Sequence, residues 1–172
     1  MKRLAISILV LTILLMPVQA FAAKAEAVIA GTGENSKIAG SALFQDTEEG
    51  LKADIKVAGA APGLHGIHIH ENGSCEDKGN AAGGHYNPDG MKHGFLPTDG
   101  MQGAHAGDLG NITINEMGEG NLSLTIPGLT VNGEKHPIVN RAVILHEKQD
   151  DFGQPTGNAG GRVACGVIKA SE

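Results

Sequence analysis

Histidines dominate the side chains that could do chemistry in this chain. Eight histidines occur in 172 residues, beside one tyrosine and no tryptophan. His68 and His70 are separated by a single residue, and side chains two positions apart on an extended strand point to the same face. Two imidazoles side by side can bind a metal ion. The His-x-His pattern also arises by chance, and the alternative is a pair of ordinary surface histidines.

A second group of possible ligands lies further along the chain. His85, His93 and His105 are followed by Asp108 within one glycine-rich segment. Three neutral imidazoles and one carboxylate match the ligand set of a four-coordinate zinc site. Zinc has no redox chemistry, so a closed site of this kind would mainly order the segment that holds it.

A further histidine, His146, follows the apolar run 142–145. A strand there could carry His146 to the mouth of a barrel, beside His68 and His70. Imidazole-rich sites with access to solvent suit copper. The sequence therefore predicts a second metal site, which is distinct from the zinc site.

The elements that must position these residues are predicted to be β-strands. Twenty-six glycines and seven prolines divide the sequence into short pieces, and no stretch after the N-terminal region has a long apolar pattern at helical spacing. In residues 51–57, apolar and charged residues alternate as in a half-buried strand. The chain reads as all-β, with eight strands that suit a sandwich or a flattened barrel. The predicted strands are 26–30, 37–45, 50–57, 66–70, 110–114, 120–126, 141–145 and 163–168.

Two regions, 71–108 and 147–162, do not read as strands. The first is far longer than an ordinary connection, and long ordered loops are usually functional. Because this segment has little apolar content to form a core, another feature must keep it ordered, such as a metal ion or a disulfide. The only two cysteines are Cys75 and Cys165, and their pairing would close a loop of about 90 residues, worth roughly 4–5 kcal/mol in the chain-entropy model. Two separate buried thiols are the alternative.

The N-terminus has the features of a secretory signal peptide. Met1-Lys2-Arg3 precedes the apolar run Leu4–Met16, and small residues around Ala20–Ala22 offer a cleavage site. The run is shorter than the roughly 20 residues that span a bilayer, which argues against the alternative of a membrane anchor. We therefore predict cleavage of residues 1–22 and a single mature domain at 23–172.

An export signal would place the protein in the periplasm of a Gram-negative host, or outside the cell in any other host. Oxidation of the two thiols is expected in either compartment. The net charge of -6 and the lack of a basic cluster argue against nucleic acid as a partner, and against a membrane after cleavage.

Five stretches of the chain resemble the copper/zinc superoxide dismutase family, especially its bacterial exported members. They occur in the order found in the family and frame most of the predicted mature chain. The resemblance implies an eight-stranded Greek-key flattened barrel with two long functional loops. It also implies disproportionation of superoxide into dioxygen and hydrogen peroxide. The stretches are Gly63–Glu71 (GLHGIHIHE), Gly84–Pro88 (GHYNP), His105–Asn111 (HAGDLGN), His146–Asp151 (HEKQDD) and Gly157–Gly166 (GNAGGRVACG).

The resemblance also implies a role for each site residue. His85 would join the two metals as an imidazolate, and would take up a proton when copper is reduced. Asp150 would accept hydrogen bonds from one histidine of each metal, and Arg162 would attract and orient the small anion. The implied copper ligands are His68, His70, His85 and His146, and the implied zinc ligands are His85, His93, His105 and Asp108.

Some features depart from the family or leave alternatives open. The segment 146–162 is shorter than in eukaryotic members, which puts electrostatic steering in doubt, and differences in 70–85 leave both a monomer and a homodimer open. His65 is expected to brace the barrel by hydrogen bonding, and His136 to be an exposed turn residue. The rival functions are a metal carrier without turnover and a zinc hydrolase, which would need an open position on zinc.

Overall fold

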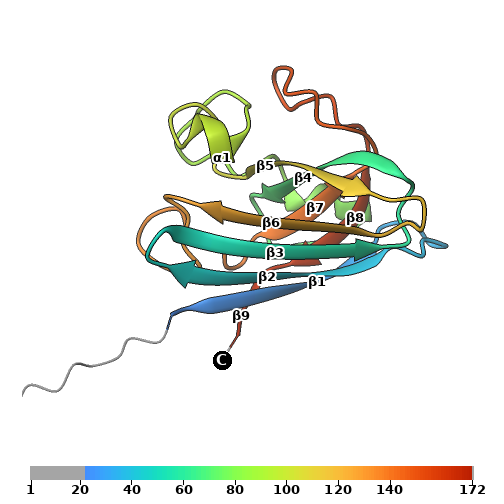
Figure 1. Cartoon of the computed structure of the whole chain (residues 1–172), viewed down its shortest axis with the longest axis horizontal. Coiled ribbons are helices and arrows are strands. Elements are labelled where there is room, and N and C mark those ends of the chain that lie inside the picture. The colour runs from blue at the N-terminus through green and yellow to red at the C-terminus, as the bar shows by residue number, and fades with distance from the viewer. Residues whose placement is uncertain (1–21, 172) are drawn as a thin grey trace, which may run out of the picture.

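Antiparallel strands closed into a barrel form the body of the protein. The computed structural model describes residues 22–171, so the predicted signal peptide at 1–22 lies outside the described residues except for Ala22. The strands follow one another around the barrel in the order β2-β3-β6-β5-β4-β7-β8-β1, and β1 pairs with β2 to close it (Figure 1). Their bounds are β1 Lys24–Gly31, β2 Ala39–Thr47, β3 Gly50–Ala58, β4 Gly63–His70, β5 Asp108–Ile114, β6 Gly120–Ile126, β7 Ala142–His146 and β8 Arg162–Val167.

Alternation of apolar and polar residues explains why these segments form barrel strands. In β3, Leu51, Ala53, Ile55 and Val57 are buried, and the residues between them face outward or are half-buried. The same two-residue period occurs in β1. Inward-facing side chains of the strands form one main apolar core, whose burial is the principal driving force for folding.

The predicted all-β fold is confirmed, and each of the eight predicted strands is present. The ends differ by at most three residues, and both ends of β6 agree: β4 begins at Gly63 instead of Gly66, and β7 begins at Ala142 instead of Arg141. A ninth strand, β9 (Lys169–Ser171), was not predicted; it follows β8 directly and pairs with the first residues of β1.

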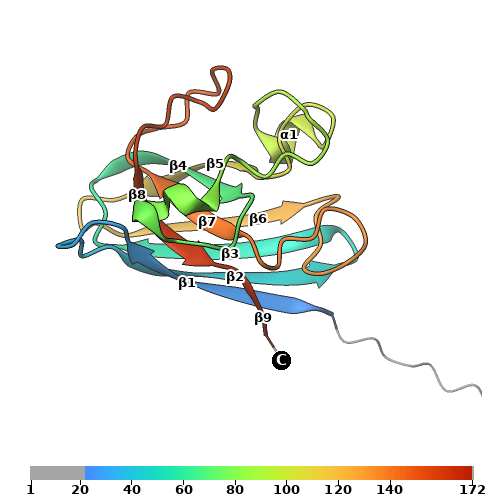
Figure 2. The ribbon, with the colours of Figure 1, turned by 180° about the vertical axis from the view of Figure 1, so that it is seen from behind.

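The two segments predicted not to be strands lie over the same side of the barrel (Figures 1 and 2). The segment between β4 and β5 holds only a short 3-10 helix, η1 (Asp77–Ala82), and one α-helical turn, α1 (Leu96–Asp99). The segment between β7 and β8 has no regular structure. Both views of the ribbon place the α1 region and the β7–β8 loop above the barrel on one side (Figures 1 and 2). Within residues 22–171, no helix is long and apolar enough to cross a membrane.

Candidate metal centre

Two neighbouring strands position three of the histidines. β4 pairs with β7, so that His68 lies opposite Ile144 and His70 opposite Ala142. On β4 the intervening Ile69 belongs to the barrel core and is fully buried, which agrees with the alternation of faces along a strand. His146 ends β7, after a register shift that sets it opposite the first residue of β8.

His68, His70, His85 and His146 form a first group, in which each residue offers a ring nitrogen within 4.8 Å of the others. The ring centroids of His68 and His85 are 4.1 Å apart. His70 Nε2 and His146 Nε2 are 3.3 Å apart. The Nδ1 atoms of the same two rings donate to Gly83 O at 3.0 Å and Gly160 O at 3.2 Å. A neutral imidazole carries one ring proton, and these bonds assign it to Nδ1 in both rings. The unprotonated Nε2 atoms of His70 and His146 therefore face each other with their lone pairs, an arrangement that suits a cation between them.

His85, His93, His105 and Asp108 form a second group, also within 4.8 Å. Asp108 Oδ1 lies 2.8 Å from His85 Nδ1 and 3.1 Å from His105 Nδ1, and Oδ2 lies 2.9 Å from His93 Nδ1. Oδ2 also accepts hydrogen bonds from the backbone N–H groups of Gly94 and His105, both at 3.0 Å. These two bonds fix the carboxylate at the start of β5 with its oxygens among the three rings.

Two buried nitrogens indicate that these residues fit metal ions. His68 Nδ1 in the first group and His93 Nδ1 in the second are buried without a hydrogen-bond partner. His93 Nδ1 is close to Asp108 but lacks the angle for a hydrogen bond. An unpartnered buried polar atom costs about 1–3 kcal/mol, and a bound cation would satisfy both nitrogens. The donor sets also suit the metals, with four imidazoles in one group and three imidazoles with a carboxylate in the other.

His85 is the residue that the two groups share. The segment that carries it crosses the end of β4, where His70 and His85 form an isolated antiparallel bridge. The next residue, Tyr86, donates its N–H to Ile69 O at 2.9 Å. His85 is therefore attached to the same strand that carries His68 and His70, and its ring stands between them and Asp108.

Asp150 also connects the two groups. One oxygen of its carboxylate lies 2.8 Å from His68 Nε2, and the other lies 2.9 Å from His93 Nε2. The side chain is fully buried. Asn111 holds this residue in place because its amide donates to Asp150 O at 2.9 Å and accepts from Asp150 N–H at 2.8 Å.

Burial and charge act differently on the two groups. Burial lowers the pKa of His68 to about 4 and that of His146 to about 3, and lowers the pKa of His70 further still. These rings are therefore neutral and available as ligands. Burial also opposes charge on His93, but the carboxylates of Asp108, 2.9 Å from its Nδ1, and of Asp150, hydrogen-bonded to its Nε2, outweigh burial and raise its pKa to about 9.

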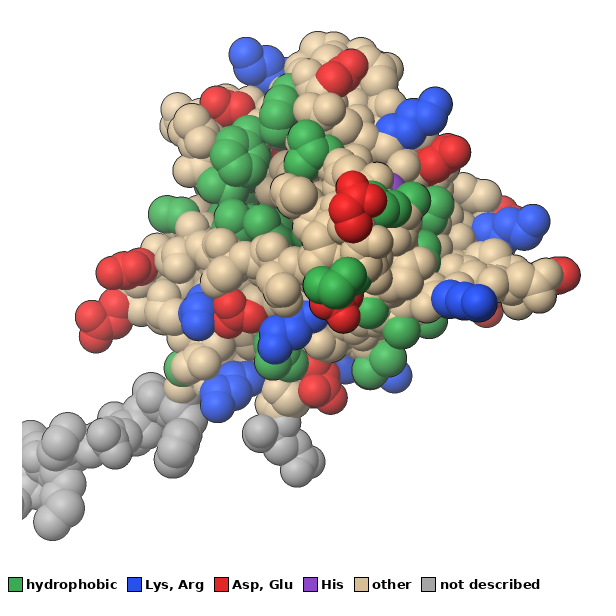
Figure 3. Space-filling view, turned by 45° about the vertical axis from the view of Figure 1, so that its right-hand side comes forward, with side chains coloured by type: hydrophobic (Ala, Val, Ile, Leu, Met, Phe, Trp, Pro, Cys, Tyr) green, Lys and Arg blue, Asp and Glu red, His purple; other side chains and the backbone are tan. Residues whose placement is uncertain are grey.

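The two carboxylates stay ionised for a related reason. Burial favours the protonated form of Asp108, but the hydrogen bond from His85 and the contact with His93 hold its pKa well below the ordinary value. Bonds from His68 and His93 do the same for Asp150. The histidines of both groups are buried, and only a small area of histidine surface is visible in the space-filling view (Figure 3).

Comparison with known proteins agrees with this geometry. The family model of copper/zinc superoxide dismutase (SODC) matches residues 38–168. The chain belongs to the copper/zinc superoxide dismutase family. A solved structure described as a crystal structure analysis of the clock protein EA4 is 36% identical, with a TM-score of 0.77 over 90% of this chain and 99% of that one.

In this family member, Arg162 stands beside the first group at the start of β8. Its Nη1 donates to Gly79 O and its Nη2 to Gly83 O, both at 2.6 Å. Gly83 O also accepts from His70 Nδ1, so Arg162 and His70 share one acceptor. The charge of Arg162 contributes to lowering the pKa of both His70 and His146.

The predicted disulfide between Cys75 and Cys165 is present, with a Cα–Cα distance of 5.7 Å. Cys165 lies on β8, three residues after Arg162, and Cys75 precedes η1. The disulfide and the two hydrogen bonds of Arg162 therefore attach the same segment, 75–83, to the same strand. Arg162 depends for its position on carbonyl groups that the disulfide helps to hold.

The two histidines predicted to lie outside the metal groups have defined roles. His65 braces the barrel as expected, because its ring nitrogens lie 2.8 Å from His146 O and from Ala61 O. His136 occupies a turn, with φ 46°, but its predicted exposure is wrong. The residue is half-buried, and its ring contacts Asp89 Oδ2 at 2.8 Å and Gly128 O at 3.0 Å.

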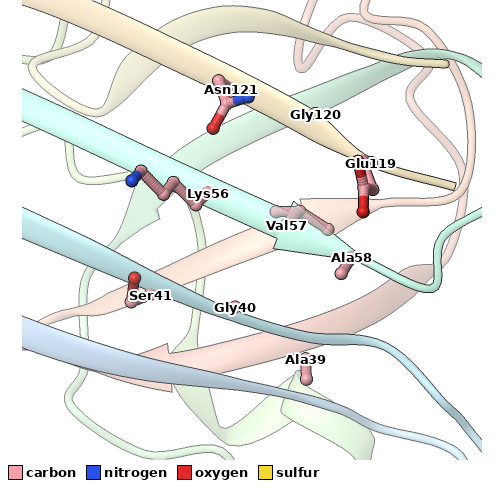
Figure 4. Close-up of a pocket in the computed structure, with 9 residues that line it drawn as sticks. All are labelled: Ala39, Gly40, Ser41, Lys56, Val57, Ala58, Glu119, Gly120 and Asn121. Carbon is pink, nitrogen blue, oxygen red and sulfur yellow. The ribbon is translucent and has the colours of Figure 1, made fainter.

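A hollow elsewhere on the surface contains none of these residues. It has a volume of about 310 Å³, and its lining comes from β2, β3 and the start of β6, including Ser41, Lys56 and Asn121 (Figure 4). Gly40 and Gly120 help to form it because they carry no side chain. No member of either metal group lies in this hollow, so it adds nothing to the candidate metal centre.

Proposed function

We propose that this protein converts superoxide into dioxygen and hydrogen peroxide with one copper and one zinc ion. The first group, His68, His70, His85 and His146, would hold copper, and the second group, His85, His93, His105 and Asp108, would hold zinc. Family membership supports the reaction, and the observation that carries the assignment is the presence of His85 in both groups. Copper would supply the reversible one-electron chemistry, and zinc, which has none, would fix the second group.

The protein's own residues would bring the anion to the first group and hold it there. Arg162 offers a permanent positive charge and planar donors beside His70 and His146, and its two bonds to backbone carbonyls restrict its motion. A fixed charge of this kind raises the local concentration of a small anion and speeds its arrival. The net charge of -6 makes this local positive site more important.

His85 would carry the proton that the product needs. Formation of hydrogen peroxide consumes two protons for each dioxygen released, and a ring placed between the two groups can take up and give back one of them. Asp108 stays ionised beside His85 Nδ1 at 2.8 Å, so this nitrogen remains tied to the second group. Asp150 orients His68 and His93 through their outer nitrogens.

Superoxide consumption by protein loaded with copper alone, with zinc alone, or with both tests the proposal. We expect activity only when copper is present, with the highest rate for the doubly loaded protein. A metal carrier would show no turnover with any loading. A zinc hydrolase would act independently of copper, and either result would contradict the proposed function.

Replacing Arg162 tests its role in attracting the anion. Arg162→Gln should lower the rate at low ionic strength by about 10-fold or more and weaken its salt dependence. Arg141→Gln is a matched control, because Arg141 also bonds to loop carbonyls, Glu71 O at 2.9 Å and Pro137 O at 2.8 Å. An equal loss in both variants would mean that loosening of the loop, and not the lost charge, lowers the rate.

We also propose that the protein is exported, with residues 1–22 removed. The disulfide supports this proposal, since such bonds persist mainly in oxidising compartments. N-terminal sequencing of the protein from fractionated cells tests it: we expect a start near Ala23 in the exported fraction. An intact Met1 in the cytosolic fraction would contradict the proposal.

A further inference from the structure

The loop between β7 and β8 contacts His93 through a residue with no role in either metal group. Gln154 Nε2 donates a hydrogen bond to His93 O at 2.8 Å, and Gln154 Oε1 accepts one from His93 N–H at 3.1 Å. One side-chain amide thus pairs with both backbone groups of His93, as a neighbouring strand would. Gln154 itself is exposed, so this pairing is not part of an apolar core.

Phe152, two residues earlier, covers the outer side of the same histidine. Its ring stacks on the His93 ring, with centroids 6.4 Å apart and planes at 21°, and it also contacts Phe95. The Phe152 N–H donates to Asp150 Oδ1 at 2.8 Å. Gln154, Phe152 and His93 line a surface hollow of about 370 Å³, and the His93 side chain is fully buried beneath it.

The backbone of His93 needs a fixed position because its ring contacts two carboxylates, one at each ring nitrogen. Nε2 faces Asp150 on the β7–β8 loop, and Nδ1 faces Asp108 at the start of β5. His93 itself lies in a stretch with no regular structure, so no ladder of backbone hydrogen bonds fixes its position. The only side chain among residues 22–171 that bonds to its backbone N–H and C=O is that of Gln154.

We propose that Gln154 is a positioning residue for His93 and slows the release of metal from the second group. It holds the His93 backbone at the distance from the β7–β8 loop at which the ring reaches both carboxylates. This inference rests on the proposed function, because it takes the metal of the second group to be zinc. It assigns to the exposed tip of the β7–β8 loop a direct part in zinc retention.

The test is the rate at which zinc leaves the fully metallated protein for a colour-forming chelator. Gln154→Met keeps the length of the side chain and removes both hydrogen bonds, and Gln154→Asn keeps an amide that is too short to make both. We expect zinc release to be about 10-fold faster in each variant, the lower end of the range for lost contacts around metal ligands. Visible absorption of cobalt(II) in the second group should also change, because it reports ligand geometry.

Asn158→Gly is the matched control. Asn158 carries an amide in the same loop, but it bonds only to Asp151 within that loop, and its φ of 52° is one that glycine adopts readily. Wild-type rates in both Gln154 variants, or equal acceleration in Asn158→Gly, would overturn the inference. Failure of the wild-type protein to bind zinc would instead overturn the proposed function.

Discussion

The two metal groups differ in what holds their ligands. His68, His70 and His146 stand on paired strands, and the side chains between them, such as Ile69 and Leu145, belong to the barrel core. The second group draws its histidines from the long segment between β4 and β5, which has almost no regular structure. Polar contacts with Asp108, Asp150 and the Gln154 amide hold it, together with the disulfide.

This difference predicts that the two groups respond differently to loss of metal and to mutation. The barrel forms its backbone ladder and its apolar core from its own residues, so the strand-borne histidines should keep their places without a metal ion. The loop-borne histidines lie around an ionised carboxylate, and their order should depend on charge, hydrogen bonds and the disulfide. A mutation in one region should therefore affect its own group more than the other.

Removal of the disulfide should have the largest effect. Cys75→Ser opens a covalent link between residues 90 apart in sequence, and we expect the free energy of unfolding to fall by about 4 kcal/mol. Because the link attaches the β4–β5 segment, the second group should also lose its metal faster. Urea unfolding and metal content after mild chelation measure the two effects. Full metal retention in this variant would show that the segment does not need the disulfide.

Asp108→Asn should have the next largest effect and act mainly on the second group. Asp108 Oδ2 accepts from the N–H groups of Gly94 and His105, and Oδ1 lies beside His85 and His105, whereas asparagine offers one acceptor oxygen and no charge. We expect a loss of about 3 kcal/mol in stability. Zinc affinity should fall, and copper affinity should change little; titration of the metal-free protein with each metal checks this. Equal weakening of both affinities would contradict separate support of the groups.

The sequence predicted the strand-borne group better than the loop contacts. The shared face of His68 and His70 follows from alternation along a strand, and the place of His146 follows from the apolar run that it ends; both are local properties of the chain. The histidines that bond to Asp150 were expected only from the family resemblance. Asn111 bonds to the Asp150 backbone from 39 positions away and Gln154 to the His93 backbone from 61 positions away, and no local pattern encodes such contacts. Asn111 was part of a recognised stretch but received no role, because its function as a clamp appears only when the two segments meet.

Acid and alkali should distinguish the two groups in the metal-free protein. Histidines of the unfolded chain titrate near pH 6.5, whereas burial lowers the pKa of His146 to about 3. Below pH 6.5 the unfolded state therefore binds more protons, and the stability that neutral His146 contributes is lost as pH falls towards 3. Asp108 and Asp150 raise the pKa of His93 to about 9 against the effect of burial, so its contribution to stability changes with pH in the opposite direction. Its contribution is full below pH 6.5 and is lost as pH rises through 9.

Urea unfolding of the metal-free protein at pH 5, 7 and 9 measures these slopes. From pH 7 to pH 5, His146 should account for a loss of about 2 kcal/mol. His146→Gln should make the free energy of unfolding less dependent on pH between 7 and 5, and His93→Gln should do the same between 7 and 9. A wild-type acid slope in His146→Gln would mean that its ring is not held neutral by burial.

The smallest expected effect comes from the core behind the strand-borne group. Ile69 is fully buried between His68 and His70, and Ile69→Val removes one methylene, which should lower stability by about 1 kcal/mol. The backbone ladder between β4 and β7 stays intact, so neither metal affinity should change measurably. Calorimetric titration with each metal, beside urea unfolding, checks this. A marked loss of copper affinity would show that packing behind the strand, and not the ladder alone, sets the direction of the ligands.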